Sequence, residues 1–263
     1  MTRLLHIADL HFGAEDAGLV DAFLRFSRAY GPDLVVAAGD FTQDGRKREF
    51  DAAADFFRSL DVPVIGAAGN HDVPVRSVWE RFMSPWRRFR NLLDGCVVDR
   101  WQDELVVVET LHTARRAQWQ FDWSLGQASH RDVKSVVDRL GQATGRARIL
   151  TCHHPLRAPG GNRGRAKTRH ADVAANVLES SCDLVLTGHL HETFVLPAVT
   201  PGESCWFIGA GTTFSRRTRT EPAGFNAIEI SEDGFEIRHV VAGSDDSFEF
   251  GRSWSLPRPP VTG

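Results

Sequence analysis

The sequence predicts an α/β fold, because strands alternate with helices in its first part and polar residues follow each strand. Buried strands are expected at residues 4–8, 34–38 and 62–66, and apolar side chains at helical spacing predict helices over 17–30 and 50–60. Such alternation implies parallel strands joined by crossover helices. Parallel strands end at one edge of their sheet, where ligands bind.

The middle of the chain is less regular, but strands and helices can still be assigned. We expect a helical apolar stripe over 78–93, hairpin strands at 97–98 and 105–108, helices over 131–140 and 171–178, and strands at 148–152 and 183–186.

After residue 191 the pattern changes to short apolar stretches separated by turns. These stretches predict strands at 193–197, 204–208, 225–230 and 235–241. We expect their hairpins to form a second sheet that packs on the first. No repeat or linker interrupts the chain, so we interpret it as a single domain over 1–250 followed by a proline-rich tail over 251–263.

Length and composition are those of a globular protein, with 263 residues, 42% hydrophobic and 25% charged, enough for one large domain or two small ones. The net charge of −3 gives no global basic field that would attract nucleic acid. Four widely spaced cysteines match neither a zinc finger nor a disulfide framework, which favours reduced thiols and a cytoplasmic location. We find no signal peptide and no apolar run of membrane-spanning length.

Residue types that bind metals gather at the exits of five predicted strands, with glycine nearby at Gly39, Gly69 and Gly188. The polar residues are Asp9, His11, Asp40, Asn70, His71, His153, His154, His189 and His191. Any one of them alone would be interpreted as a helix cap or a buried polar side chain. Their joint occurrence at five exits favours a metal site.

The number and type of these residues favour two metal ions. Oxygen and nitrogen ligands without thiolates suit manganese, iron and zinc. Seven or eight ligands are too many for one tetrahedral ion, whereas two ions that share a carboxylate would use them all. Two ions about 3.5–4 Å apart are a standard device for hydrolysing phosphate esters. On an extended segment, His189 and His191 would face the same way.

The five exit motifs together resemble those of the calcineurin-like metallophosphoesterases. They are Asp9-Leu10-His11, Gly39-Asp40 with Gly45, Gly69-Asn70-His71-Asp72, His153-His154-Pro155 and Gly188-His189-Leu190-His191, in the family's order. As a set the motifs are highly specific, although none is specific alone. The resemblance implies a four-layer α-β-β-α sandwich, the metallophosphoesterase fold.

The resemblance also implies a role for each residue. It places Asp9, His11 and His191 on one metal ion and Asn70, His153 and His189 on the other, with Asp40 bridging them. His71 is implied to contact the phosphate and to serve catalysis, and Asp72 could orient it. His154 is assigned a supporting or structural role. The implied cofactors are two divalent or trivalent metal ions, with manganese and iron favoured and zinc as the alternative.

A closer resemblance concerns the substrate. The Gly-Asn-His-Asp and His-His-Pro forms, together with residues 210–213, 215–217 and 221–226, resemble the bacterial class III cyclic nucleotide phosphodiesterases. This implies hydrolysis of a small phosphodiester substrate, with 3′,5′-cyclic nucleotides as the leading candidate, by attack of a metal-bridging hydroxide.

A loop rich in glycine and arginine spans residues 157–169, shortly after the predicted ligand His153. We expect this loop to border the site, with Arg157 binding substrate alongside Asn70 and His71. A solvated surface loop is the alternative interpretation.

Three other functions stay open. A nuclease of the same superfamily needs a basic surface to bind nucleic acid. The net charge of −3 argues against this function, but the arginines within 76–90 and 157–169 could form such a surface. A nucleotide-sugar or lipid pyrophosphatase needs an apolar groove, which Trp79, Phe82, Trp86 and Phe89 could form. A non-catalytic binding protein could use the same fold, although the complete ligand set opposes this. A homodimer also stays open.

Overall fold

The computed structural model describes residues 1–74, 78–115, 124–162, 166, 168–215, 221–245 and 247–258. In spatial order, its first sheet contains β14 (Phe248–Pro257), β13 (Gly234–Ala242), β12 (Gly224–Ile230), β1 (Thr2–Ile7), β2 (Leu34–Ala37) and β3 (Val64–Gly66). The second contains β10 (Phe194–Pro197), β11 (Trp206–Gly209), β9 (Leu184–Thr187), β7 (Ala147–Thr151), β5 (Val106–Thr110) and β4 (Arg100–Gln102).

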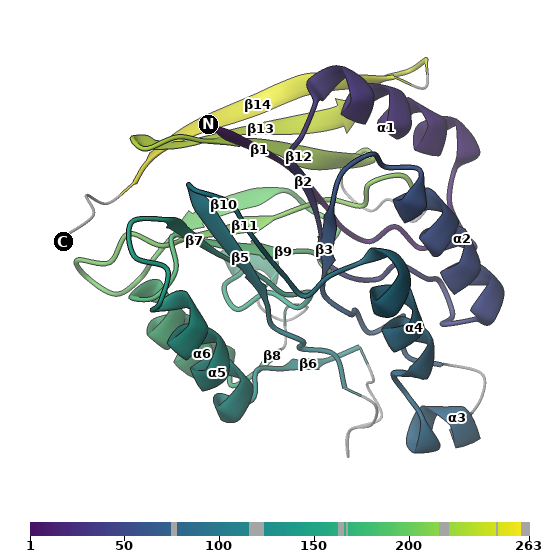
Figure 1. Ribbon diagram of the computed structural model, residues 1–263, viewed down its shortest axis with the longest axis horizontal. Coiled ribbons are helices and arrows are strands. Elements are labelled where there is room, and N and C mark those ends of the chain that lie inside the picture. Colours follow the sequence, from purple (N-terminus) through teal and green to yellow (C-terminus); the bar gives the residue numbers. More distant parts are fainter. Residues whose placement is uncertain are drawn as a thin grey trace.

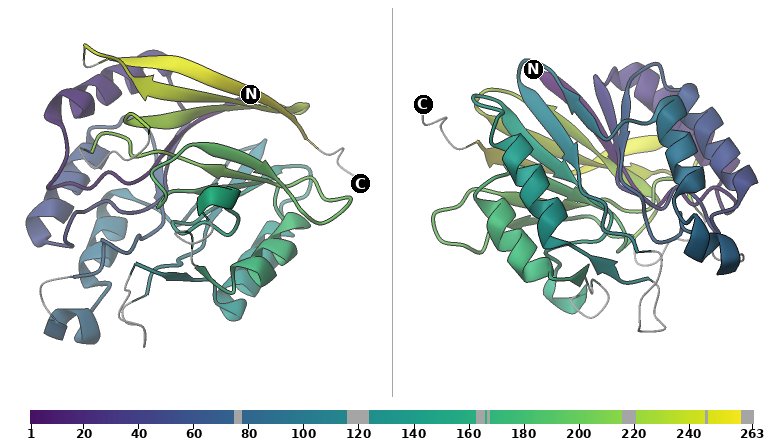
Figure 2. Two further views of the ribbon diagram at one scale, coloured as in Figure 1. Left: turned by 180° about the vertical axis from the view of Figure 1, so that it is seen from behind. Right: turned by 60° about the horizontal axis from the view of Figure 1, so that its bottom comes forward.

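Helices cover the outer faces of the two sheets, as Figure 1 and Figure 2 show. Those beside the first sheet are α1 (Ala17–Tyr30), α2 (Lys47–Arg58) and α4 (Arg87–Cys96), with α3 (Val78–Met83) beyond α4. Those beside the second sheet are α5 (His130–Leu140) and α6 (Ala171–Glu179). A short ribbon of β6 (Gly126–Gln127) and β8 (Thr168–Arg169) lies apart from both sheets. The predicted α/β fold with four α-β-β-α layers is confirmed.

Three apolar layers hold the sandwich together, because alternate residues of a strand point to opposite faces. In β1, Leu5 packs outward with α1 and α2, whereas Leu4 packs inward between the sheets. In β9, Val185 packs outward with α5 and α6, whereas Leu184 joins the layer between the sheets. His6 follows the alternation of Leu4 and is fully buried, so a histidine lies between the two sheets.

The strands after residue 191 do not form a sheet of their own, so that expectation is wrong. β10 and β11 extend the second sheet, with β11 parallel to β9. The chain then returns to the first sheet, where β12 pairs antiparallel with β1. Each sheet therefore combines parallel strands from the first part of the chain with strands from the last part. Apolar spacing identifies a strand but not the sheet that it joins.

The predicted tail over 251–263 is wrong for its first half, because β14 continues to Pro257. This edge strand pairs antiparallel with β13 along its length. Most of its side chains are exposed and Leu256 is buried. The strand therefore depends on backbone pairing and shows little of the apolar alternation that would have revealed it. Residues 259–263 lie outside the described part.

The four cysteines are free thiols, and Cys152, Cys182 and Cys205 are buried, in agreement with the sequence analysis. Within the described part of the chain, none of the helices has both the length and the apolar character that a membrane span requires.

Candidate metal centre

Side chains from strands of both sheets meet at one end of the sandwich. Asp9 and His11 follow β1, and His191 follows β9. The Asp9 Oδ1 atom is 3.2 Å from His191 Nε2, and the Nε2 atoms of His11 and His191 are 3.4 Å apart. All three side chains are buried. A carboxylate and two imidazoles this close together form a first candidate metal position.

Asp40, at the exit of β2, joins this group to a second one. Its Oδ2 atom is 3.9 Å from His11 Nε2 and 3.3 Å from the Nε2 atom of His153, which follows β7. The ring of His189 lies beside that of His153, with centroids 5.2 Å apart. Asn70 follows β3. The Asp40 carboxylate therefore lies between two groups of metal-binding side chains.

Each carboxylate is held by a backbone N–H at one oxygen and presents the other oxygen to imidazoles. The backbone N–H of His189 donates to Asp9 Oδ2 at 2.8 Å, so Asp9 Oδ1 faces the first group. The backbone N–H of His71 donates to Asp40 Oδ1 at 2.8 Å, so Asp40 Oδ2 faces His153. Both carboxylates are thus oriented before any cation binds.

The backbone is left-handed at five of the predicted ligands. The angle φ is 52° at Asp9, 49° at His11, 52° at Asp40, 70° at His189 and 57° at His191. This conformation costs a residue with a Cβ atom roughly 1–2 kcal/mol, and such strain gathers at functional sites. The prediction that His189 and His191 face the same way on an extended segment is wrong, because their imidazoles join different groups.

Glycine is needed beside the ligands because the backbone passes very close to them. A Cβ atom on Gly69 would lie 2.1 Å from Asp40 Oδ1, and one on Gly39 would lie 2.6 Å from His153 Nδ1. Contacts this short are excluded, so a side chain at either position would push the ligand away. This explains the glycines that the sequence analysis found near the strand exits.

Burial and charge set the protonation of the cluster. Burial disfavours a charged His153, but the Asp40 carboxylate raises its pKa to about 9. Burial lowers the pKa of His11 to about 3 and that of His189 to about 4. Burial also disfavours ionised Asp40, yet the surrounding histidines hold its pKa well below the usual range. The cluster therefore contains ionised carboxylates and mainly neutral imidazoles, as metal binding requires, and a cation would displace one proton from His153.

The polar atoms of the cluster fit bound cations. Asn70 Oδ1 is buried and has no hydrogen-bond partner among the described residues. Asp9 Oδ1 and His153 Nε2 are also buried without a formal hydrogen bond there, and lie 3.2 Å from His191 Nε2 and 3.3 Å from Asp40 Oδ2. Leaving a buried polar atom unpaired costs about 1–3 kcal/mol, and a metal ion would supply the missing partner. The Nδ1–H of His153 donates to the Ala38 carbonyl at 2.8 Å, which leaves Nε2 as the ring atom that could bind a cation.

His71 lies at the rim of the cluster and is partly exposed. Its Nδ1 atom is 2.7 Å from the Gln43 carbonyl oxygen, which can only accept, so Nδ1 carries the proton. The ring meets that of His11 edge-on, with centroids 4.9 Å apart. The Gln43 carbonyl therefore orients this imidazole.

Asp72 does not orient His71, so that predicted role is wrong. One oxygen of its buried carboxylate accepts the backbone N–H of Gly69 at 2.9 Å, and the other accepts the N–H and hydroxyl of Thr42 at 2.9 and 3.0 Å. Burial, together with the nearby Asp40 carboxylate, raises the pKa of Asp72 to about 6. Asp72 instead fastens the loop that carries Asn70 and His71.

His154 supports the cluster from behind. Its Nε2 atom is 3.0 Å from the Ser124 carbonyl oxygen and its Nδ1 atom is 2.9 Å from the Thr113 hydroxyl. The ring packs against those of His153 and His189, with centroids 4.8 and 4.7 Å apart. His154 also lies within a possible metal-binding group with His153 and His189, but both of its ring nitrogens have partners in the chain, and its supporting role stays a prediction.

Arg157 is not brought to the cluster. Its guanidinium donates to Glu179 at 2.9 Å, to Asp172 at 2.9 Å and to Asn176, all on α6. These partners occupy the donors that a substrate would need, so the contacts contradict the substrate-binding role predicted for this residue. The remainder of the loop is not tested, since residues 163–165 and 167 lie outside the described part.

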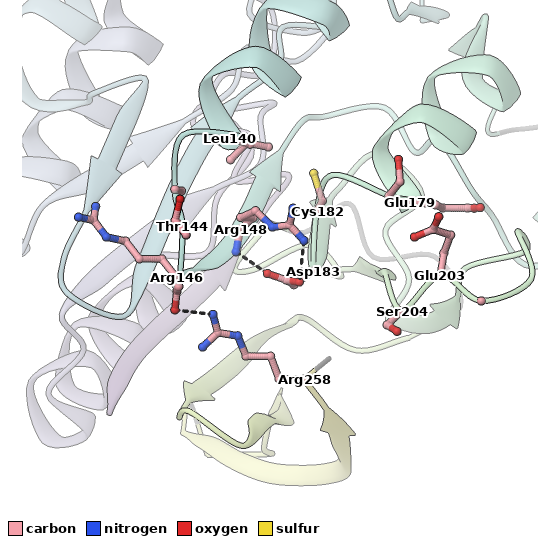
Figure 3. Close-up of a pocket in the computed structure, with 15 residues that line it drawn as sticks. Leu140, Thr144, Arg146, Arg148, Glu179, Cys182, Asp183, Glu203, Ser204 and Arg258 are labelled. Atoms are coloured by element: carbon pink, nitrogen blue, oxygen red, sulfur yellow. Dashed lines mark hydrogen bonds and ion pairs between the residues drawn. The ribbon is translucent and has the colours of Figure 1, made fainter. Parts of the chain in front are cut away.

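Glu179 also lines a polar pocket of about 340 Å³ at the amino-terminal edge of the second sheet, opposite the strand exits (Figure 3). Two of the charged side chains drawn there pair with each other, and a third binds a backbone carbonyl. Arg148 Nη2 lies 3.5 Å from Asp183 Oδ1, and Arg258 donates to the Gly145 carbonyl at 2.9 Å. The pocket is separate from the metal-ligand cluster.

The sequence analysis did not single out His112, which follows β5 and has an exposed ring. Its Nδ1 atom accepts the backbone N–H of Ala68 at 3.3 Å, directly before the Gly69-Asn70 segment. A sixth strand exit thus reaches the rim of the site. A lone histidine has no spacing signal, and its position after the apolar run at 105–108 was the only available indication.

Comparisons with known proteins identify the family. The chain matches the family model of calcineurin-like phosphoesterases over residues 2–193. A Synechococcus sp. protein named "Probable cyclic nucleotide phosphodiesterase" is 26% identical to this chain over 231 residues. The matched region covers 83% of this chain and 80% of that relative. A purple acid phosphatase from yellow lupin (Lupinus luteus) seeds shares the fold, with a TM-score of 0.68 and 13% identity. That match covers 98% of this chain, which spans about half (54%) of the phosphatase chain. The chain therefore belongs to the calcineurin-like phosphoesterase family and is a metal-dependent phosphoester hydrolase.

Proposed function

We propose that this protein hydrolyses small phosphodiesters at a dinuclear metal centre and that 3′,5′-cyclic nucleotides are its leading candidate substrates. The position of Asp40 is the main support, since its Oδ2 atom lies 3.9 Å from His11 Nε2 and 3.3 Å from His153 Nε2. A carboxylate between two groups of ligands suits two neighbouring ions. The relative named as a cyclic nucleotide phosphodiesterase supports the substrate class.

In this proposal the ligands divide between two ions. Asp9, His11 and His191 would hold one ion, and His153 and His189 would hold the other together with Asn70. Asp40 would serve both ions, since its carboxylate lies near both groups. Manganese and iron suit these donors best, with zinc as the alternative. When bound, the ions would polarise the phosphate and lower the pKa of an attacking water molecule.

The side chain of His71 is proposed to act on the substrate. Its ring is oriented by the Gln43 carbonyl and lies beside His11 at the rim of the cluster. From there it could donate a proton to the leaving oxygen or stabilise charge on the phosphate. The backbone N–H of His71 also donates to the Asp40 carboxylate. In this proposal His71 therefore orients a metal ligand through its backbone and acts on the substrate through its side chain.

Metal analysis and a substrate panel test the proposal. Protein purified without chelator should contain about two transition-metal ions per chain. With Mn²⁺, cyclic nucleotides and bis-p-nitrophenyl phosphate should be hydrolysed faster than p-nitrophenyl phosphate, single-stranded DNA or UDP-sugars. A metal content near zero, with no Mn²⁺-dependent activity, would refute the dinuclear centre, and preferential cleavage of DNA would indicate a nuclease.

The role of His71 is tested by the leaving group. An alkoxide of high pKa needs a proton and p-nitrophenolate hardly does, so His71→Ala should slow cyclic nucleotide hydrolysis by roughly 10²–10⁴-fold. It should slow bis-p-nitrophenyl phosphate hydrolysis far less and keep both metal ions. His130→Ala, at an exposed histidine of α5, is the control and should match wild type. Loss of metal from His71→Ala would make His71 a ligand, and equal slowing of both substrates would assign it to charge stabilisation.

An exposed apolar patch favours a second candidate, a lipid or nucleotide-sugar pyrophosphatase. Trp79 and Phe82 on α3 are 77% and 46% exposed. Phe89 is buried and Trp86 packs against the core, so the predicted four-residue stripe does not form one groove. Adding a lipid-linked pyrophosphate to the panel separates the candidates, since a strong preference for it over cyclic nucleotides would favour this one.

A further inference from the structure

Two buried threonines connect the segment after β11 to the segment after β1. The Thr212 hydroxyl donates to the Asp9 carbonyl oxygen at 2.6 Å, and the Thr213 hydroxyl lies 3.1 Å from both the N–H and the carbonyl oxygen of Ala8. Both threonine side chains are almost completely inaccessible, with 1% and 0% exposure. These contacts join a segment that leaves the second sheet to the strand exit of the first.

The contact made by Thr212 bears directly on Asp9. The backbone of Asp9 is left-handed, with φ 52°, which a residue with a Cβ atom adopts only when its surroundings hold it. Thr212 fixes the carbonyl side of Asp9, and the Gly39 carbonyl fixes its N–H at 3.0 Å. The Asp9 carboxylate is thereby turned toward His191.

Thr212 is itself tied to the first sheet. Its carbonyl oxygen accepts the backbone N–H of Gly224, the first residue of β12, at 2.8 Å. Because β12 pairs with β1, Thr212 is fixed relative to the strand that carries Asp9. The opposing ligands His189 and His191 come from the second sheet, so the alignment of the two halves of the centre depends on contacts of this kind.

We infer that Thr212 is a positioning residue of the metal centre, which orients Asp9 through its carbonyl group. This inference rests on the proposed function, because it takes Asp9 as a metal ligand. The hydroxyl itself is not a ligand and acts by keeping Asp9 left-handed. Removing it should therefore weaken metal retention more than a merely structural hydrogen bond would.

Metal retention by the loaded protein tests the inference. Wild type, Thr212→Val and Thr212→Ser are loaded with Mn²⁺ and titrated with a competing chelator, and the retained metal is measured. Groups that orient a ligand typically change metal affinity by about 10–100-fold, so Thr212→Val should lose affinity by about 10-fold or more. Thr212→Ser keeps the hydroxyl and should stay close to wild type.

Thr2→Val is the matched control. Thr2 is a buried threonine at the other end of β1, and its hydroxyl donates to Asp103 at 2.7 Å. This variant should unfold at lower urea concentration than wild type while retaining metal normally. If Thr212→Val does not fold, the comparison of Thr212→Ala with Thr212→Ser replaces it.

The outcomes are distinguishable. If wild type holds two ions and the variant without the hydroxyl retains them equally well, the inference on Thr212 is overturned and the proposed function stands. If Thr2→Val loses metal to the same extent, the effect is general destabilisation and the inference is also overturned. If wild type itself holds no metal, the proposed function fails, and the inference fails with it.

Discussion

Acid should destabilise this protein in a way that depends on one buried histidine. His6 lies between the two sheets with no exposed surface. Its Nδ1 atom is 3.3 Å from the Asn226 side-chain nitrogen, which also donates to the Gly209 carbonyl. Burial lowers the pKa of His6 to about 3, although the Thr187 backbone and the Asp9 carboxylate favour the charged ring. The folded protein therefore holds His6 neutral.

The size of the effect follows from the difference between the folded and unfolded states. Unfolded His6 binds a proton near pH 6.5, whereas folded His6 binds one only near pH 3. The unfolded state carries more protons between these values, so the free energy of unfolding falls as the pH falls through this window. One pKa unit corresponds to about 1.4 kcal/mol, so going from pH 7 to pH 5 should remove about 2 kcal/mol through His6 alone.

His6→Gln tests this reasoning, because glutamine is polar, similar in size and does not titrate. His130→Gln, at an exposed histidine, is the control. Urea unfolding is followed by tryptophan fluorescence at pH 7 and pH 5 with equal metal content. His6→Gln should be less stable than wild type at pH 7 but lose about 2 kcal/mol less on going to pH 5. The same pH dependence in all three proteins, or a steeper loss in His6→Gln, would refute the argument.

Three further changes have defined outcomes. Gly69→Ala should release most of the metal, because the new Cβ atom would lie 2.1 Å from Asp40 Oδ1. Gly160→Ala is the control and should retain the metal, because its new Cβ atom meets nothing within 4 Å. Equal metal retention by the two variants would contradict this. Arg157→Ala removes the guanidinium from the Glu179 carboxylate, which keeps its hydrogen bonds from Val199 and Thr200, so the free energy of unfolding should fall by about 1–3 kcal/mol with KM unchanged. A raised KM for anionic substrates would restore the predicted role of Arg157. Asp40→Ala should lose both ions, whereas in His154→Ala the metal affinity should fall by only about 10–100-fold. Equal metal loss from the two variants would mean that one of the two roles is misassigned.

The strand exits could be predicted from the sequence because their signals are local. A buried apolar run followed by Asp9, Asp40 or His153 is visible in a few residues, and the structure brings six of the seven predicted ligands together, all except Asn70. Their assignment to two ions stays a prediction.

The failed predictions concern partners that are distant in space or sequence. Asp72 was placed beside His71 because the two are neighbours in the chain, but Thr42, 30 residues away, binds its carboxylate. Arg157 was expected at the site because it follows the predicted ligand His153 by four residues, but the buried Glu179 carboxylate binds its guanidinium. A single charged residue does not reveal which partner the fold will supply.

The pairing of β1 with β12 has a consequence for the order of events during synthesis. Thr2 pairs with Ile230, and Thr212 reaches back across 203 positions to Asp9. A nascent chain released residue by residue has no antiparallel neighbour for β1 until most of the protein has left the ribosome. The Asp9 backbone can use the Gly39 carbonyl early, but it lacks the hydrogen bond from Thr212 until the segment after β11 is translated. Metal loading should accordingly follow translation, and cotranslational binding by truncated nascent chains should be weak.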